Sequence, residues 1–381
     1  KPETHVYMIS MDGPLYELEL ATLNATLLFD LVDVLNIPVS KDPHTTGQCY
    51  PHFKDALTVH TTTDGQGGIP QGDKPSGVLY VASNGYNEAD YVNGSSCGRL
   101  ASWDGQNWTI LDQTAYYSLA ARKNYGRMIY AAGWDSKSVI LRVKDQGSPD
   151  APSVNSDWKV LRLPKASHAF DHGWQTEWPR IREVETERYL LDAHGMFYEL
   201  SPLGWASSTW GIRPISQHLR VIPDFASFRG LLVMGGNEVS SIFDNNVVTG
   251  QAQSGLWLGK TDDLWNWGKP QGYGSVFREE ALKTGVASDP FLMTGFDKKV
   301  LHLSRDDNPT PTSVNVSFAI ELDTLGNAMQ TGRWRRLAIV TLDNNNHWFQ
   351  AYVFQSGLSA QWVRVVPLTD CVMCSATFIY T

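Results

Sequence analysis

Leu100-Ala-Ser-Trp-Asp-Gly-Gln-Asn-Trp108-Thr-Ile-Leu111 places a polar turn between two short β-rich runs, and the second run begins at a tryptophan. A turn rich in Gly, Asn and Asp between two such runs indicates an antiparallel hairpin. The pattern recurs at Trp158, Trp210 and Trp267, and successive tryptophans lie 50, 52 and 57 residues apart. A repeat of this length with several strands per unit is typical of the blades of a β-propeller.

The period divides the 381 residues into about seven units. We therefore predict an all-β fold, a seven-bladed β-propeller that forms a single catalytic domain over residues 1–381. A β-sandwich is the alternative, but it does not predict a repeat of this length. Apolar runs that begin at Arg127, Tyr189, Leu231 and Phe291 are expected to be inner strands, buried on both faces. We expect the strand around residues 5–9 to close the ring by pairing with the C-terminal blade.

The composition excludes some classes of partner. The net charge is -9, whereas nucleic-acid binding requires clustered Lys and Arg, so we expect no nucleic-acid partner. No apolar run approaches the length of a membrane span, so we expect no membrane partner. We also expect the protein to be a monomer. The chain starts at Lys1 rather than Met, which we interpret as a processed or trimmed chain.

Sequons and cysteines indicate an extracellular protein. The acceptors of the four N-glycosylation sequons are Asn24, Asn93, Asn107 and Asn315. The four cysteines are Cys49, Cys97, Cys371 and Cys374. This even set favours two structural disulfides and leaves three pairings open, while a zinc or redox role for the C-terminal pair is the alternative. We expect a secreted, extracellular glycoprotein.

Histidines concentrate in two long segments without regular structure, 40–77 and 164–182, which hold five of the ten in the chain. Histidine titrates near neutral pH, so a cluster suggests acid–base chemistry or metal ligation. His168, His194 and His218 form a further set that could hold a metal or form a polar belt. We favour the belt, because no carboxylate lies at ligand spacing in the sequence.

Several motifs resemble a known group of enzymes. They are Arg162-Leu-Pro-Lys-Ala-Ser-His-Ala-Phe-Asp-His-Gly-Trp-Gln-Thr-Glu-Trp-Pro-Arg-Ile-Arg182, Gly133-Trp-Asp-Ser-Lys-Ser-Val-Ile-Leu-Arg142, Asp192-Ala-His-Gly-Met-Phe-Tyr198, His218-Leu-Arg-Val-Ile-Pro-Asp-Phe225 and Ser288-Asp-Pro-Phe-Leu292. Together they resemble the seven-bladed propellers of polysaccharide lyase family 42 and glycoside hydrolase family 145, over residues 52–296. The resemblance to the L-rhamnose-α-1,4-D-glucuronate lyases implies β-elimination of terminal L-rhamnose from D-glucuronate on acidic arabinogalactan, as in gum arabic.

The resemblance also implies roles for individual residues. The family's catalytic histidine matches His60, with His52 as the alternative, because extra residues separate His60 from the strand that ends at Asn84. Elimination requires the uronate carboxylate to be neutralised and a proton to be moved at C5 and at the leaving oxygen. The remaining candidates are Tyr125 or Tyr86 as accessory acid–base, Asn84 as a substrate contact, Arg182 and Arg220 as carboxylate clamps, and Trp134, His172 and His194 as pocket walls.

Other functions stay open at this point. An α-L-rhamnosidase would hydrolyse the same bond with most of the same pocket residues. A lectin-like propeller would bind sugar without turnover, although lectin propellers carry a similar site in every blade. We expect no required cofactor, and the sequence leaves open a structural calcium in the central channel.

Overall fold

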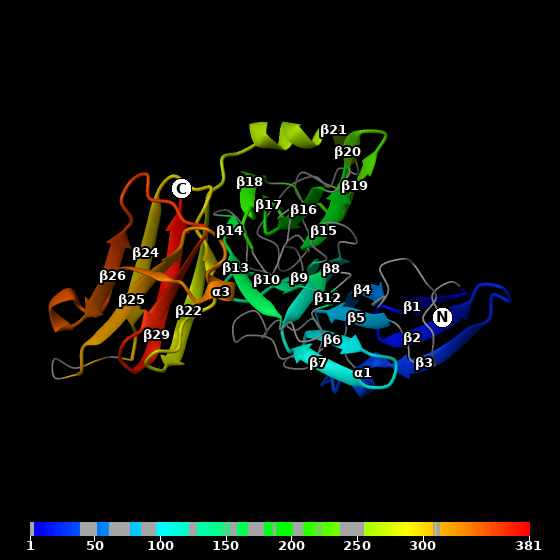
Figure 1. The fold of residues 1–381 in the computed structure, drawn as a ribbon, viewed down its shortest axis with the longest axis horizontal. Helices are drawn as coiled ribbons and strands as arrows, with labels where there is room; N and C mark the ends of the chain where they lie inside the picture. The colour runs from blue at the N-terminus through cyan, green and yellow to red at the C-terminus, as the bar shows by residue number, and fades with distance from the viewer. Residues whose placement is uncertain are drawn as a thin grey trace, which may run out of the picture. The chain divides into compact units, whose positions relative to one another are not determined.

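β-strands dominate the computed structural model of the protein (Figure 1). The structure describes residues 4–38, 52–60, 77–84, 97–121, 128–145, 147–148, 151–152, 158–166, 179–185, 188–200, 209–218, 220, 222–236, 255–307, 309 and 313–381. Among these residues the helices are short: α1 (Leu31–Val34), η1 (Thr261–Asn266), α3 (Ala328–Thr331) and η2 (Asn344–Asn346). The prediction of an all-β fold is confirmed.

The chain divides into two compact units. Unit 1 consists of residues 1–136, 146–157 and 171–174, and unit 2 of residues 137–145, 158–170 and 175–381.

Unit 1 begins with an antiparallel sheet of three consecutive strands. They are β1 (His5–Ile9), β2 (Pro14–Glu19) and β3 (Ala25–Asp30). Asp30 then caps α1, because its carboxylate accepts a hydrogen bond of 3.0 Å from the Val32 N–H. Leu15 and Leu31 are completely buried in the core that this sheet and helix share with the next sheet.

The second sheet of unit 1 has the order that a propeller blade requires. Four consecutive antiparallel strands follow one another as β4 (Phe53–His60), β5 (Gly77–Ser83), β6 (Arg99–Trp103) and β7 (Trp108–Asp112). Trp103 pairs with Trp108, and their rings stack with centroids 6.1 Å apart. The predicted tryptophan hairpin is confirmed here. The remaining strands of unit 1 are β8 (Ala115–Ala121), β9 (Met128–Trp134), β11 (Gly147–Ser148) and β12 (Ala151–Pro152).

Unit 2 contains a second meander of four strands. These strands are β15 (Arg180–Val184), β16 (Arg188–Ala193), β17 (Met196–Glu199) and β18 (Arg213–Gln217), each antiparallel to the next. Strands β10 (Val139–Asp145) and β13 (Lys159–Leu163) form the hairpin predicted around Trp158. Strands are found at the runs that begin at Arg127, Tyr189 and Leu231, as β9, β16 and β20 (Leu231–Gly236). Burial on both faces holds for β9 and for most of β16, whereas β20 alternates between buried and half-buried residues, and the run at Phe291 forms a strand of only two residues.

The fourth predicted hairpin is wrong in its second half. Strand β20 pairs with β19 (Phe225–Phe228) and with β21 (Gly255–Gly259). The residues before Trp267, however, form the 3-10 helix η1 instead of a turn into a strand. The start of η1 is fixed locally, because the Asp263 side chain accepts a hydrogen bond of 2.8 Å from the Lys260 N–H.

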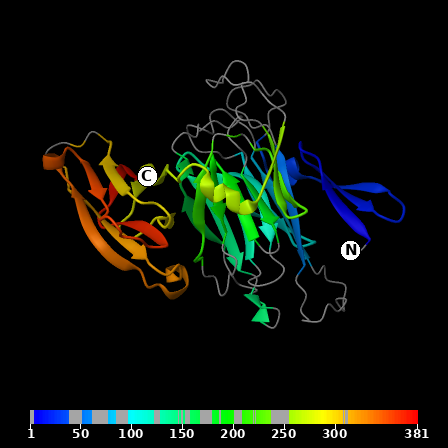
Figure 2. The same ribbon diagram turned by 90° about the horizontal axis from the view of Figure 1, so that it is seen from above.

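The C-terminal strands of unit 2 pair out of sequence order. One sheet has the order β14 (Lys165–Ala166), β22 (Gly272–Leu282), β29 (Cys371–Tyr380), β24 (Lys299–Arg305) and β27 (Phe349–Val353). The other contains β23 (Phe291–Leu292), β28 (Trp362–Pro367), β25 (Val316–Asp323) and β26 (Arg335–Leu342). The two sheets face each other, and Phe291 of one stacks on Phe378 of the other with centroids 4.8 Å apart. Figure 2 shows the strands from β22 to β29, coloured yellow to red, close to one another.

This C-terminal arrangement bears on the predicted blade count. In a propeller blade, consecutive strands are neighbours, whereas here the chain alternates between two layers, as it does in a β-sandwich. The count of seven blades and a single domain over residues 1–381 are therefore not confirmed. Strand β1 pairs with β2, and ring closure stays a prediction.

Candidate functional site

The direction of one hairpin separates two of the predicted site residues. Strands β4 and β5 are antiparallel, and His60 pairs with Gly77 while Phe53 pairs with Ser83. Asn84 directly follows Ser83, so it lies at the opposite end of the hairpin from His60. Seven residues of strand separate the two ends, roughly 23 Å at about 3.3 Å per residue. His60 and Asn84 therefore do not line one small pocket.

The hairpin instead brings His52, the alternative histidine, next to Asn84. The Asn84 N–H donates a hydrogen bond of 3.0 Å to the His52 carbonyl oxygen, so the two residues are cross-strand neighbours. Asn84 is 6% exposed, and its side-chain Oδ1 has no hydrogen-bond partner among the described residues. A buried amide acceptor in this state is open to a ligand or a water molecule.

The surroundings of His52 favour its neutral form. Burial, and then the positive charge of Lys54, lower the pKa of His52 to about 4. At neutral pH the imidazole is thus unprotonated and can accept a proton. Lys54 was not predicted as a site residue, because a single lysine two positions along a strand carries no distinctive sequence signal. His52, Lys54 and Asn84 together form what we term the His52 group.

A second polar group lies in unit 2, at the turn between β16 and β17. Ala193 pairs with Met196, so His194 and Gly195 form a two-residue turn, with φ values of 48° and 75°. This left-handed geometry favours Asn-Gly, and histidine is among the non-glycine residues that adopt it more readily than others. Burial, and then the charge of Lys165, hold the pKa of His194 well below its usual range. His194 is therefore neutral at neutral pH.

Asp192, His218 and Arg220 form a chain of hydrogen bonds beside this turn. The Arg220 N–H donates to Nδ1 of His218 at 3.3 Å, which places the proton of a neutral ring on Nε2. Nε2 then donates to Oδ1 of Asp192 at 3.0 Å. The Arg220 guanidinium lies over the Trp267 ring, 5.8 Å from its centroid. The sequence alone did not reveal this carboxylate partner, because 26 residues separate Asp192 from His218.

Two other predicted contacts have different surroundings. Arg182 forms an ion pair with Asp224, with 2.8 Å between Nη2 and Oδ2. To hold a substrate carboxylate, the Arg182 guanidinium would have to bind it in addition to Asp224 or in place of Asp224. Trp134 is buried and stacks on Tyr117, with 6.1 Å between centroids, so its ring offers little surface to a sugar. The predicted residues Tyr86, Tyr125 and His172 lie outside the described residues.

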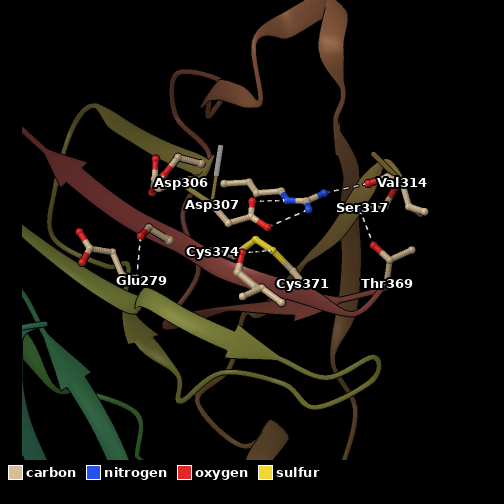
Figure 3. The surroundings of a disulfide bond; sticks show 12 residues. Glu279, Asp306, Asp307, Val314, Ser317, Thr369, Cys371 and Cys374 are labelled. Carbon is tan, nitrogen blue, oxygen red and sulfur yellow. Dashed lines mark hydrogen bonds and ion pairs between the residues drawn. A yellow bond between two sulfur atoms is a disulfide. The ribbon is translucent and has the colours of Figure 1, made fainter. Parts of the chain in front are cut away.

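The glycosylation and disulfide predictions are tested only in part. Asn24, Asn107 and Asn315 are exposed, whereas Asn93 lies outside the described residues. Cys371 is bonded to Cys374 (Figure 3). This finding resolves one of the pairings that the sequence left open.

Two further cysteines complete the set. Cys97 is also disulfide-bonded, and its partner lies outside the part of the chain that the structure describes, as does Cys49.

Metal ligands and membrane spans were sought among the described residues. No group of three or more His, Cys, Asp or Glu side chains there could hold a metal ion. Within the same residues, no helix has the length and apolar character that crossing a membrane requires. The structural calcium that the sequence left open is not tested beyond these residues.

Comparisons with known proteins define no family for this chain. No protein-family model and no curated protein match it. Solved structures of a fructofuranosidase from Schwanniomyces occidentalis match with low similarity. The complex with fructose has 10% identity, covers 99% of this chain and 92% of its own, and has a TM-score of 0.25. The complex of a variant of this enzyme with fructosylnystose has 10% identity, covers 99% of this chain and 91% of its own, and has a TM-score of 0.28. At these TM-scores the likeness supports no argument about fold or activity.

Proposed function

We propose that this chain is a secreted polysaccharide lyase that releases terminal L-rhamnose from D-glucuronate by β-elimination. The motifs between residues 52 and 296 that resemble polysaccharide lyase family 42 suggest the substrate. The observation that carries the proposal is the His52 group, in which a histidine with a lowered pKa is the cross-strand neighbour of Asn84 and is influenced by the charge of Lys54. A base and a cation are two of the groups that elimination from a uronate requires.

In the proposed reaction, His52 removes the proton from C5 of the glucuronate. The electron pair of that C–H bond forms the C4–C5 double bond, and the C4–O bond breaks. The oxygen leaves with rhamnose and takes up the proton that the His52 imidazolium holds, so the products are free rhamnose, an unsaturated uronate and the neutral imidazole. Lys54 stabilises the carboxylate, on which negative charge accumulates as the C5 proton leaves, while the buried Oδ1 of Asn84 can accept a hydrogen bond from a sugar hydroxyl.

Substrate binding would tune the base. An imidazole with a pKa of about 4 is a weak base at neutral pH. A bound carboxylate would partly cancel the field of Lys54, and a nearby negative charge favours a protonated imidazole. The pKa of His52 would thus rise when a uronate is bound, while burial, the larger cause, continues to hold it below its ordinary value. His52 would then be a stronger base in the complex than in the free enzyme.

The deciding experiment compares two histidine variants on gum arabic. Rhamnose and the ultraviolet absorbance of the unsaturated uronate are measured together for the parent, His52→Ala and His60→Ala. We expect both signals to be lost in His52→Ala and kept in His60→Ala, with circular dichroism confirming that both variants fold. The reverse pattern would restore His60 as the base. Rhamnose without absorbance would instead identify a rhamnosidase, and binding without either signal a lectin.

A further inference from the structure

We propose that an open pocket around Trp265 is a non-catalytic binding site for a neutral pyranose ring of a polysaccharide. The pocket has a volume of about 400 Å³ and lies within unit 2. Its walls come from the start of β18, from η1 and the residues after it, and from the loop after β23. We call it the Trp265 pocket; the residues used below are Arg213, Pro214, Trp265, Trp267, Lys269 and Gly295.

Trp265 provides an aromatic surface that is held in place. Trp265 is 43% exposed, whereas most large apolar residues among those that the structure describes are less exposed. The Arg213 guanidinium lies 5.0 Å from the ring centroid and is itself fixed by an ion pair with Glu199, with 2.9 Å between Nε and Oε2. Glu199 also pairs with Arg188 at 3.3 Å. A rigid, partly exposed indole is suited to stack on the C–H face of a sugar, because little side-chain entropy is lost on binding.

The pocket is shaped by a close approach of two backbone segments. Gly295 has a φ of 86°, and a Cβ at this position would come within 2.6 Å of the Pro214 ring. Only glycine therefore fits there without displacing the proline. Trp267 packs against Trp257, with centroids 5.3 Å apart, so a second wall is also fixed.

The charge of the pocket indicates a neutral ligand. Its two cations, Arg213 and Lys269, are each paired with a carboxylate, and the Lys269–Asp297 distance is 2.8 Å. Their remaining N–H groups can donate hydrogen bonds to hydroxyls, but the pairs cancel most of the attraction for a uronate. No His, Asp, Glu, Tyr, Ser or Cys lines the pocket, and of the residues that do, Thr294 supplies a single hydroxyl and Lys269 supplies an amine that is paired with Asp297. These features fit binding rather than catalysis.

The choice of polymer for the test rests on the proposed function. The full-length His52→Ala protein is run in native gels that contain either gum arabic or a neutral β-linked galactan. Trp265→Ala is compared with Trp210→Ala, an equally exposed tryptophan (40%) that does not line the pocket. We expect retardation by both polymers, about tenfold weaker for Trp265→Ala and unchanged for Trp210→Ala. Circular dichroism spectra identical to the parent show that both variants fold.

Salt and the lyase assay separate the possible failures. Binding to a neutral sugar is expected to persist at raised ionic strength, whereas its loss would reassign the pocket to an acidic sugar and overturn the proposal. Equal retardation of Trp265→Ala and the parent would also overturn it. If the parent produces unsaturated uronate but galactan does not retard it, the pocket proposal fails while the lyase proposal stands. If galactan retards the parent but the parent produces no unsaturated uronate, the lyase proposal fails while the pocket proposal stands.

Discussion

Replacing Asp192 by alanine tests whether the hydrogen-bond chain through His218 is a structural unit. The Asp192 carboxylate is completely buried and accepts the Nε2–H of His218, whose side chain is only 3% exposed. The variant leaves this donor buried without an acceptor, which costs about 1–3 kcal/mol of unfolding free energy. Without the carboxylate, the His218 ring can also carry its proton on Nδ1 instead of Nε2. Nδ1 then no longer accepts the hydrogen bond from the Arg220 N–H.

A matched control separates burial from charge. Asp224→Ala removes an ion pair with Arg182 in which both partners are substantially exposed, 54% and 33%, and we expect a loss below about 1 kcal/mol. Urea unfolding of the parent and both variants, followed by circular dichroism, measures the two losses. In addition, Asp192→Asn keeps an oxygen acceptor and should recover part of the stability. An Asp192→Ala protein no less stable than Asp224→Ala would refute the reasoning.

Three further predictions concern stability. His52 and His194 have pKa values below those of histidine in the unfolded chain, so the unfolded state binds more protons and the free energy of unfolding should fall as the pH decreases below about 6.5. In urea titrations at several pH values, His194→Gln should reduce this fall, and an unchanged pH profile would contradict the prediction. Removing the Cys371–Cys374 bond with two serines should cost only about 2 kcal/mol, because the bond closes a very short loop; a loss of melting temperature as large as that expected for a long loop would contradict this estimate. Asp323→Ala should destabilise by about 3 kcal/mol or more in urea unfolding, because the carboxylate accepts three backbone N–H groups, from residues 325, 326 and 328; a loss below about 1 kcal/mol would count against it.

Part of the fold was accessible from local pattern. The hairpin at Trp103 and Trp108 was predicted because a short polar turn between two β-rich runs specifies its own pairing. The hairpin expected at Trp267 was wrong, since an Asp263 cap favours a 3-10 helix over the same kind of sequence. The spacing of the tryptophans between residues 108 and 267 was also assumed to continue into the C-terminal region. There the strands alternate between two sheets instead of following one another within a blade. Such pairing depends on contacts between distant segments, which no local repeat records.

The sequence by itself determined the strand content, the first hairpins and the residue types available for acid–base chemistry. It also contained an unused signal for the site, because a hairpin over residues 53–60 and 77–83 must place His60 near its loop and Asn84 at the open end. Only the tertiary structure decided which histidine lies next to Asn84 and that Asp192 accepts from His218. The physical reason is that strand direction and register set which side chains meet, and burial then sets their protonation.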